Sequence, residues 1–298
     1  MFKNLLQKFK QQNIVGKYIY VNVAVYIIVV LIGFFSILFN MGGTLGTFVR
    51  YFELPSSLPL LLQRPWTLVT YMFLHEHFMH ILWNMVALYV FGGIFLDFYS
   101  LRHFVGTYIL GGLFGGAAFV LSYNIFPYFE PYVGSSYLLG ASASVLAVVV
   151  ATAVRNPGYR INLLLVGSVK LSTFAVITVA ISVFMLAGNN AGGNFAHLGG
   201  ALAGWLVAYM LNKGVDLTSL VNRPIDWFTT LFTGRRTSRK KKTKFKYSAG
   251  GRSADYEYNA RKKETDAEID RILEKIKKGG YSSLSDDEKR RLFEASKR

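Results

Sequence analysis

Six apolar segments separated by short polar stretches occupy most of the sequence up to residue 212. Each is close to the roughly 20 residues that an α-helix needs to cross the hydrocarbon core of a bilayer. Because lipid offers no hydrogen-bond partners, such segments must satisfy their backbone groups internally, as helices do. The pattern therefore predicts an all-α, polytopic membrane protein. The spanning helices are expected at about 18–39, 77–97, 103–123, 137–154, 169–187 and 195–211.

The charges are divided unevenly along the chain. Residues 18–212 contain six Lys or Arg and four Asp or Glu, whereas residues 213–298 contain 23 and 13. This division indicates a membrane domain followed by a charged soluble tail. We assign an N-terminal cytoplasmic segment (1–17), the membrane domain (18–212), a basic linker expected to be disordered (213–260) and a small helical module (261–298). The absence of cysteine excludes disulfides and thiolate sites.

Basic residues mark one side of the predicted membrane domain. If the N-terminus is cytoplasmic, the four lysines of residues 1–17, Arg102, Arg155 and the basic tail all lie inside, whereas Arg50 and Arg64 lie outside. The positive-inside rule therefore predicts that both termini are cytoplasmic. The chain shows no transit-like leader, which favours a bacterial inner (plasma) membrane over an organelle.

The segment between the first two predicted spans is neither a solvated loop nor a span. Residues 40–74 combine Gly, Pro and charged residues with many apolar side chains. A loop half-buried at the membrane interface fits this mixture best.

Polar side chains at membrane depth are costly and mark functional sites. The predicted spans carry Ser142 within GASAS, His197 within NFAHLGG, and His80 and Asn84 within HEHFMHILWN. Each of these residues lies near the start of a span that enters from the outer face. The topology therefore predicts that all four meet at one depth, open to that face.

A serine and a histidine at the same depth indicate nucleophilic chemistry. A serine hydroxyl is a poor nucleophile unless a base removes its proton, and His197 is the only histidine in the second half of the chain. No acidic residue lies in the last three predicted spans, so a Ser–His–Asp triad is not available from them, whereas a Ser142–His197 dyad is.

Acyl transfer also needs hydrogen-bond donors for the oxyanion. His80 and Asn84 are four residues apart, so they share one face of a helix. The backbone N–H of Ser142 is a third candidate, because first-turn amides lack partners within the helix. Gly140 allows a tight turn before that serine.

Each fragment also has an ordinary interpretation. A serine in GASAS is often a small residue at a helix-packing contact, and a single membrane histidine can bond a neighbour or belong to a proton path. The spacing of His77 and His80 is compatible with a metal site, although His197 is the only further ligand expected at that depth. The four residues taken together favour the nucleophilic interpretation.

At these residues the sequence closely resembles the rhomboid family of intramembrane serine proteases, over about residues 15–212. Each motif is weak alone, but their order along the chain is specific. The motifs are PWTLVTYMFLH (65–75), HxxxxHxxxN (75–84), FGGIFLD (91–97), GASAS (140–144) and AHLGGALAG (196–204). The resemblance implies a six-helix rhomboid-like bundle that cuts single-span membrane proteins near the outer face.

The resemblance also implies a role for each matching residue. Ser142 is the expected nucleophile and His197 the base, while His80, Asn84 and the Ser142 backbone form the oxyanion hole. The remaining matches support the site: His75 is an additional histidine, Gly140 precedes the nucleophile, and Gly200 and Gly204 pack the sixth helix against the fourth. The family uses no metal or cofactor, so none is expected, and the expected partners are transmembrane protein substrates.

Two positions depart from the family pattern. Thr67 follows Trp66 where many members have arginine, and Leu146 stands where many members place an aromatic residue that stacks on the catalytic histidine. Neither change removes a catalytic group, so we predict a serine endopeptidase. The alternative is a rhomboid-like protein that binds transmembrane clients without cutting them.

The tail contains a basic stretch and a helical pattern. Residues 235–246 carry eight Lys or Arg, which suits either anionic lipid headgroups or a solvated linker; nucleic acid is not expected. The segments Thr265–Glu268 and Ser285–Glu288 read as capping boxes, and Gly279–Gly280 separates the two helices that they predict. The sequence thus predicts a basic linker followed by a small helical hairpin.

Overall fold

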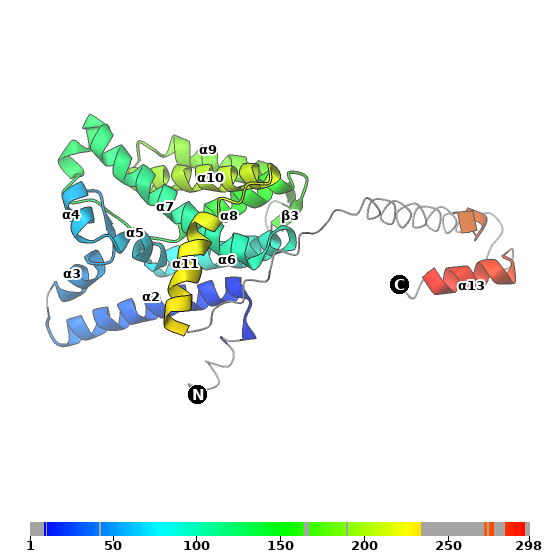
Figure 1. Ribbon diagram of the computed structural model, residues 1–298. Coiled ribbons are helices and arrows are strands. Elements are labelled where there is room, and N and C mark those ends of the chain that lie inside the picture. Colours follow the sequence, from blue (N-terminus) through cyan, green and yellow to red (C-terminus); the bar gives the residue numbers. More distant parts are fainter. Residues whose placement is uncertain are drawn as a thin grey trace. The chain divides into compact units, whose positions relative to one another are not determined.

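The computed structural model describes residue 9 and residues 11–41, 43–163, 167–188, 190–233, 271–272, 274–276 and 284–295. It divides into two compact units, Met1–Thr233 and Gly234–Arg298, which we describe separately. The first unit is a bundle whose long helices run in roughly one direction (Figure 1).

Six helices of the described residues lie where spans are predicted, which confirms the predicted all-α bundle. They are α2 (Ile14–Leu38), α6 (Phe78–Phe98), α7 (Leu101–Ile125), α8 (Ser142–Arg155), α9 (Leu171–Phe184) and α10 (Ala191–Asn212). By length and hydropathy, α2, α6 and α7 are able to cross a membrane. In contrast, α8 and α9 have 14 residues each, or about 21 Å at 1.5 Å per residue. Both are therefore shorter than the hydrocarbon core.

The fourth span begins later than its apolar pattern predicts. We expected a helix from residue 137, but Tyr137–Leu138 form strand β2, which pairs antiparallel with β1 (Leu54–Pro55). The helix starts only at Ser142, because Gly140 has a φ of 121°, outside the helical region. The fifth span is likewise preceded by a hairpin that the sequence did not predict, β3 (Arg160–Leu163) with β4 (Gly167–Lys170).

The segment between α2 and α6 folds into short pieces rather than one span. They are α3 (Thr44–Arg50), β1, α4 (Leu58–Gln63), α5 (Thr67–Thr70) and the 3₁₀ helix η1 (Tyr71–Phe73). We call these residues, 44–73, the entry loop. Leu54 and Tyr71 are buried, whereas Leu62 is exposed. A second 3₁₀ helix, η2 (Pro127–Tyr132), follows α7.

Trp66 and Thr67 are both satisfied within the entry loop. The Trp66 indole donates from Nε1 to the Tyr51 carbonyl at 3.0 Å, and the Thr67 hydroxyl donates to the Arg64 carbonyl at 2.7 Å. The Arg64 guanidinium lies over the Tyr51 ring. Threonine thus fits a position where many rhomboids have arginine, without leaving a buried polar group unpaired.

Glycines allow α10 to approach its neighbours closely. A Cβ atom on Gly200 would lie 2.2 Å from the Ala143 carbonyl oxygen of α8, and one on Gly204 would lie 2.2 Å from that of Ala147. Gly199 faces α7 in the same way, with its Cβ position 2.3 Å from the Phe114 carbonyl oxygen. Small residues give membrane helices their closest packing, because lipid supplies no hydrophobic force between spans.

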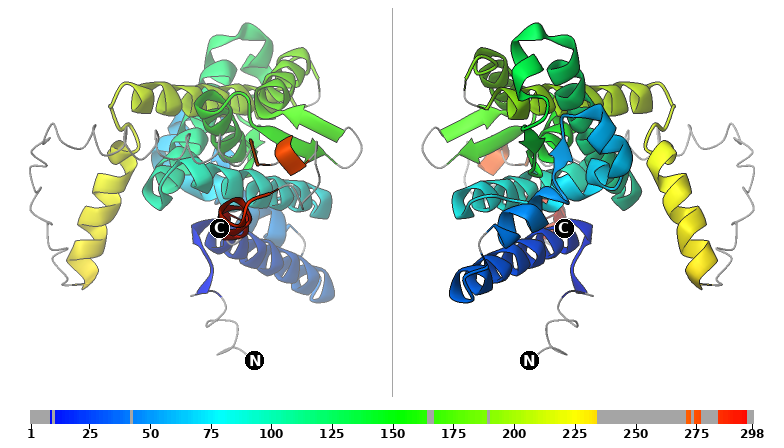
Figure 2. Two further views of the ribbon diagram at one scale, coloured as in Figure 1. Left: turned by 90° about the vertical axis from the view of Figure 1, so that its right-hand side faces the viewer. Right: turned by 90° about the vertical axis from the view of Figure 1, so that its left-hand side faces the viewer.

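The start of the predicted disordered linker is helical. Residues 213–260 were expected to be unstructured, yet α11 (Ser219–Thr233) forms after α10; residues 234–260 lie outside the described part of the chain. Figures 1 and 2 show α11 running across the direction of the long helices and projecting to one side of the bundle. We missed it because its pattern is mixed and Pro224 interrupts it.

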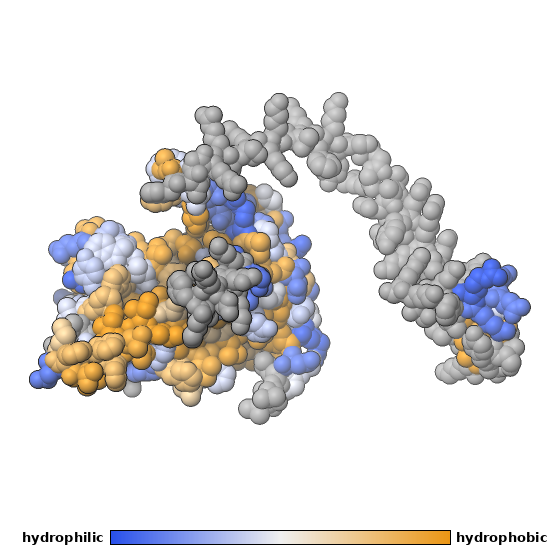
Figure 3. Space-filling view, turned by 90° about the horizontal axis from the view of Figure 1, so that it is seen from below, coloured by the Kyte–Doolittle hydropathy of each residue, from blue (hydrophilic) through white to orange (hydrophobic). Residues whose placement is uncertain are grey.

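Apolar residues cover much of the bundle surface. On the face seen in Figure 3 they form a broad band, and hydrophilic residues gather toward the two ends. Large exposed side chains such as Phe34, Trp83 and Phe184 belong to α2, α6 and α9. A surface of this kind is expected of a protein whose solvent is lipid.

In the second unit, one of the two predicted capping boxes lies among the residues that the structure describes. The Glu288 amide donates to Ser285 Oγ at 3.3 Å, and the Ser285 amide donates to Glu288 Oε2 at 2.8 Å, at the start of α13 (Asp286–Ala295). This confirms the box Ser285–Glu288. The box Thr265–Glu268 and the pair Gly279–Gly280 lie outside the described residues.

We predict that Gly204→Ala lowers the stability of the bundle. The new methyl group has no room beside the Ala147 carbonyl, so overpacking should cost about 1–3 kcal/mol and lower the midpoint of thermal unfolding in detergent. Gly93→Ala on α6 is the matched control, because its Cβ position meets no atom within 4 Å. Equal midpoints for the two variants would contradict the prediction.

Candidate active site

The turn that ends at Ser142 is fixed by its backbone. The Gly140 amide donates to the Tyr71 carbonyl of the entry loop at 2.9 Å. A Cβ atom on Gly140 would lie 2.9 Å from His80 Nε2, so a side chain fits neither the space nor the positive φ. As a result, α8 begins with Ser142 beside the His80 ring.

Ser142 and His197 are joined directly. Ser142 Oγ lies 2.8 Å from His197 Nε2, which is an ordinary hydrogen-bond distance. The serine is the first residue of α8 and the histidine lies in the second turn of α10. The packing of Gly200 and Gly204 against α8 brings these two helices together.

His80 and Asn84 lie on α6 and face the same space. Asn84 Nδ2 donates to the His80 carbonyl at 2.8 Å, which uses one of the two amide N–H groups and fixes the side chain. The His80 ring is held near Gly140 and Ser142. The predicted donors therefore lie on the wall of the cavity that also contains Ser142.

These residues line one cavity of about 870 Å³. Six of the eight predicted site residues contribute to its wall: His75, His80, Asn84, Gly140, Ser142 and His197. Gly200 and Gly204 instead pack against the backbone of α8. The structure thus brings six of the predicted residues to one cavity, and the two glycines pack α10 against α8.

Two comparisons with known proteins bear on this geometry. Residues 62–214, just over half of the chain, match the family model described as the rhomboid domain. The chain belongs to the rhomboid family. Residues 252–298 match a second model, a family of unknown function (DUF6576). No curated protein matches the chain. The rhomboid match begins inside α4, so α2 and the first part of the entry loop precede it.

His75 packs against the histidine of the predicted oxyanion hole. Its ring centroid lies 5.0 Å from that of His80 at an interplanar angle of 68°. Burial, reinforced by the neighbouring His80, lowers the pKa of His75 to about 4, so this side chain is neutral at pH 7. A neutral His75 ring packs on His80 without placing a positive charge beside it.

Ser182 on α9 is a contact that the sequence analysis missed. Its Oγ lies 3.2 Å from His197 Nδ1, on the side of the ring opposite Ser142. Its only sequence signal is a polar residue in an apolar run, which does not reveal the direction it faces. Leu146, at the position of the family's aromatic residue, is buried in a cluster that includes Phe91 and Ala201.

Among the described residues, the metal site considered for His77 and His80 is not completed by further ligands. His77 and Glu76 are exposed and lie 3.5 Å apart. Within the described residues, no group of three or more His, Cys, Asp or Glu side chains is placed to hold a metal ion. His80 instead belongs to the cavity with Ser142.

Glu53 is an acidic residue at the cavity wall that the sequence analysis also missed. It follows α3 and is buried, and Arg50 and Glu76 line the same cavity. Burial raises its pKa from 4.5 to about 7, an effect that Arg50 opposes and Glu76 reinforces. The rhomboid site thus contains a carboxyl group that changes charge near neutral pH.

We predict that Glu53→Gln stabilises the protein at pH 8 but not at pH 4. The raised pKa means that the folded state binds the proton more tightly, so the wild type loses stability as the pH rises from 4.5 to about 7. Glutamine removes this cost, which is at most about 3 kcal/mol. Thermal unfolding in detergent between pH 4 and 8 measures the difference.

The control for this prediction is Glu130→Gln, which removes an exposed carboxylate from η2. It should leave the pH dependence of unfolding as in the wild type. Parallel curves for the wild type and Glu53→Gln would show that Glu53 does not titrate as inferred.

Proposed function

We propose that this rhomboid protein is an intramembrane serine endopeptidase that hydrolyses peptide bonds in or near transmembrane segments. The observation that carries the proposal is the 2.8 Å hydrogen bond between Ser142 Oγ and His197 Nε2 at the wall of a cavity. A serine bonded to a histidine is the arrangement that general-base activation requires. No cofactor is needed for this chemistry.

The reaction follows from the dyad. His197 Nε2 takes the Ser142 proton while Oγ forms a bond to the scissile carbonyl carbon. The protonated histidine then gives that proton to the leaving amine as the C–N bond breaks, which leaves an acyl-enzyme. A water molecule then attacks the ester while His197 takes one of its protons. His197 returns that proton to Ser142 Oγ as the ester bond breaks, and the carboxyl product is released.

Three groups are suited to stabilise the oxyanion. The Ser142 amide lies in the first turn of α8, where backbone N–H groups have no intrahelical acceptor. Asn84 keeps a second amide N–H beyond the one bonded to the His80 carbonyl. The His80 ring, close to Gly140, supplies the third donor. Such donors stabilise the transition state most when they are already oriented before the reaction.

The length of α8 supports cleavage within the membrane. Arg155 ends the helix and is expected at one interface, because a charged side chain is costly in the hydrocarbon core. Ser142 is 13 residues away, or about 20 Å along the helix. In a core about 30 Å thick, the serine would lie roughly 10 Å below the opposite surface. A substrate span must therefore unwind locally to reach it.

The wider setting is part of the same proposal. The substrates are transmembrane proteins, the membrane is the bacterial inner membrane, and both termini are cytoplasmic, with the cavity open to the outer face. A client-binding protein without activity is the second candidate. The observation that favours it is Leu146, which leaves His197 without the family's aromatic partner.

We predict that Ser142→Ala abolishes cleavage of a single-span substrate by the purified protein. Removal of the nucleophile should lower the rate at least about a thousandfold. The wild type should also be labelled at Ser142 by a fluorophosphonate probe, and the variant should not.

His197→Ala and Ser144→Ala complete the test. His197→Ala should be as inactive as Ser142→Ala, whereas Ser144→Ala, also in GASAS, should remain active. Unlabelled wild-type protein that still binds a substrate span would support the client-binding function. Equal cleavage by the wild type and Ser142→Ala would place the nucleophile elsewhere.

A further inference from the structure

The His197 ring has a hydrogen-bond partner on each side. Nε2 meets Ser142 at 2.8 Å, and Nδ1 meets Ser182 Oγ at 3.2 Å. Ser182 is buried on α9, and its Oγ also lies 3.1 Å from the Thr178 carbonyl oxygen one turn earlier. The histidine is thus held between a serine on α8 and a serine on α9.

The Thr178 carbonyl decides which atoms of Ser182 and His197 carry the protons. A hydroxyl has one hydrogen, and the Thr178 carbonyl can only accept, so the Ser182 hydrogen points to that carbonyl. Ser182 Oγ then presents a lone pair to His197, which places the imidazole hydrogen on Nδ1. Nε2 remains free to accept the Ser142 proton, and this is the tautomer that a general base requires.

We propose that Ser182 is a positioning residue that holds His197 in this tautomer and orientation. The inference rests on the proposed function. It gives α9 the task that a buried carboxylate performs in Ser–His–Asp enzymes, because α8, α9 and α10 contain no acidic residue. When His197 is protonated during the reaction, Ser182 continues to accept from Nδ1–H.

Ser182→Ala tests this role. We expect kcat to fall roughly tenfold to a hundredfold, the effect of losing a hydrogen bond to a group that becomes charged. KM should stay the same, because Ser182 lies behind the histidine and does not line the cavity. Thr178→Val is the matched control: it removes a hydroxyl one turn away but keeps the carbonyl, and its kcat should equal that of the wild type.

Nitrogen-15 NMR of the histidine rings gives a readout that does not depend on activity. The His197 signals, identified by their loss in His197→Gln, should show a protonated Nδ1 in the wild type and a mixture of tautomers in Ser182→Ala. If Ser182→Ala has the same tautomer and the same kcat as the wild type, the inference is overturned. The proposed protease function would still stand in that case, provided that Ser142→Ala is inactive. If the wild type cleaves nothing, the proposed function fails and the tautomer still decides the role of Ser182.

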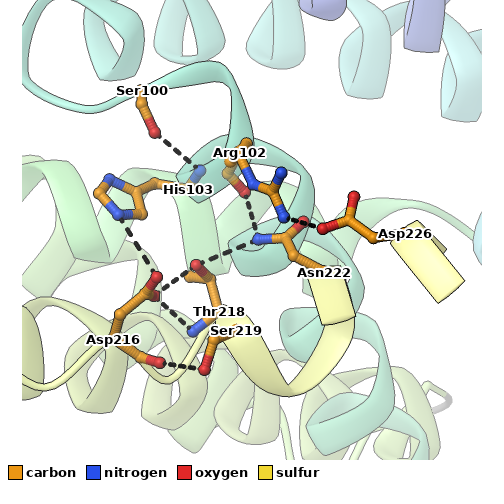
Figure 4. Close-up of polar contacts among 8 residues, drawn as sticks. All are labelled: Ser100, Arg102, His103, Asp216, Thr218, Ser219, Asn222 and Asp226. Carbon is orange, nitrogen blue, oxygen red and sulfur yellow. Dashed lines mark hydrogen bonds and ion pairs between the residues drawn. The ribbon is translucent and has the colours of Figure 1, made fainter. Parts of the chain in front are cut away.

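A separate observation concerns α11, which is anchored to the end of a spanning helix. Asn222 Nδ2 donates to the Arg102 carbonyl at 3.0 Å, and Arg102 forms an ion pair with Asp226. Figure 4 shows these groups together with Asp216, whose carboxylate accepts the Thr218 amide at 2.9 Å. Thr218 also packs against Gly106. These contacts fix α11 at the N-terminal end of α7.

The free faces of α11 differ in polarity. Leu220, Trp227 and Leu231 share one face and are 60–67% exposed. Ser219, Arg223 and Thr230 share another, next to the one that contacts α7. The helix runs across the long helices (Figures 1 and 2), and the basic segment 235–246 follows it.

We infer that α11 lies in the plane of the membrane, with its apolar face in the lipid. Its place at the end of α7 puts it at the membrane boundary, where tryptophan is enriched. An amphipathic helix parallel to the surface buries its apolar face there, and basic residues beside it attract anionic headgroups.

Because the chain has no cysteine, single spin labels can be placed without other changes. We would label Leu231→Cys and Thr230→Cys in nanodiscs of phosphatidylcholine and phosphatidylglycerol, and compare relaxation by oxygen with relaxation by a water-soluble nickel chelate. The label at 231 should respond mainly to oxygen and the label at 230 mainly to nickel. Equal nickel access at both sites, or spin–spin broadening at 231 that shows a second copy on this face, would overturn the inference.

Discussion

The close approach of α8 and α10 is the contact on which the site depends. A hydrogen bond between side chains on two different helices tolerates little change in their separation. Gly200 and Gly204 leave no room for a Cβ atom beside the Ala143 and Ala147 carbonyls, so the backbones touch at two positions about one turn apart. This is why Ser142 and His197 meet at 2.8 Å. In lipid, where apolar side chains gain little from leaving the solvent, close packing supplies the attraction.

Several buried polar side chains in the spans bond within their own helix. Asn22, Thr152 and Ser182 each donate to the carbonyl four residues earlier in their own helix, which makes them inexpensive at membrane depth. Ser142 and His197 instead bond across helices. Ser182 does both, because its hydroxyl donates within α9 and its oxygen faces His197 on α10. The dyad therefore differs from Thr152, whose hydroxyl donates only within its own helix.

The sequence was informative where one physical rule dominated. Long apolar runs identified the main helices, and the costly polar residues within them identified Ser142, His197, His80 and Asn84. The sequence was less informative where tertiary contacts determine the structure. Nothing local shows that Ser182 faces a histidine, because its role depends on the rotation of α9 against α10. Likewise, Tyr137 and Leu138 are apolar enough for a helix and become a strand only because β1 lies beside them.

The pairing of β1 with β2 also sets an order of assembly. Leu54 pairs with Leu138, and Ser56 donates to the Val133 carbonyl 77 residues later at 2.6 Å. During synthesis, the entry loop must therefore wait for α6, α7 and the connection after α7 before its hydrogen bonds are complete. Until then the edge of β1 has no partner strand. The segment that closes this edge continues directly into Ser142, so the loop and the serine reach their final conformation in the same step.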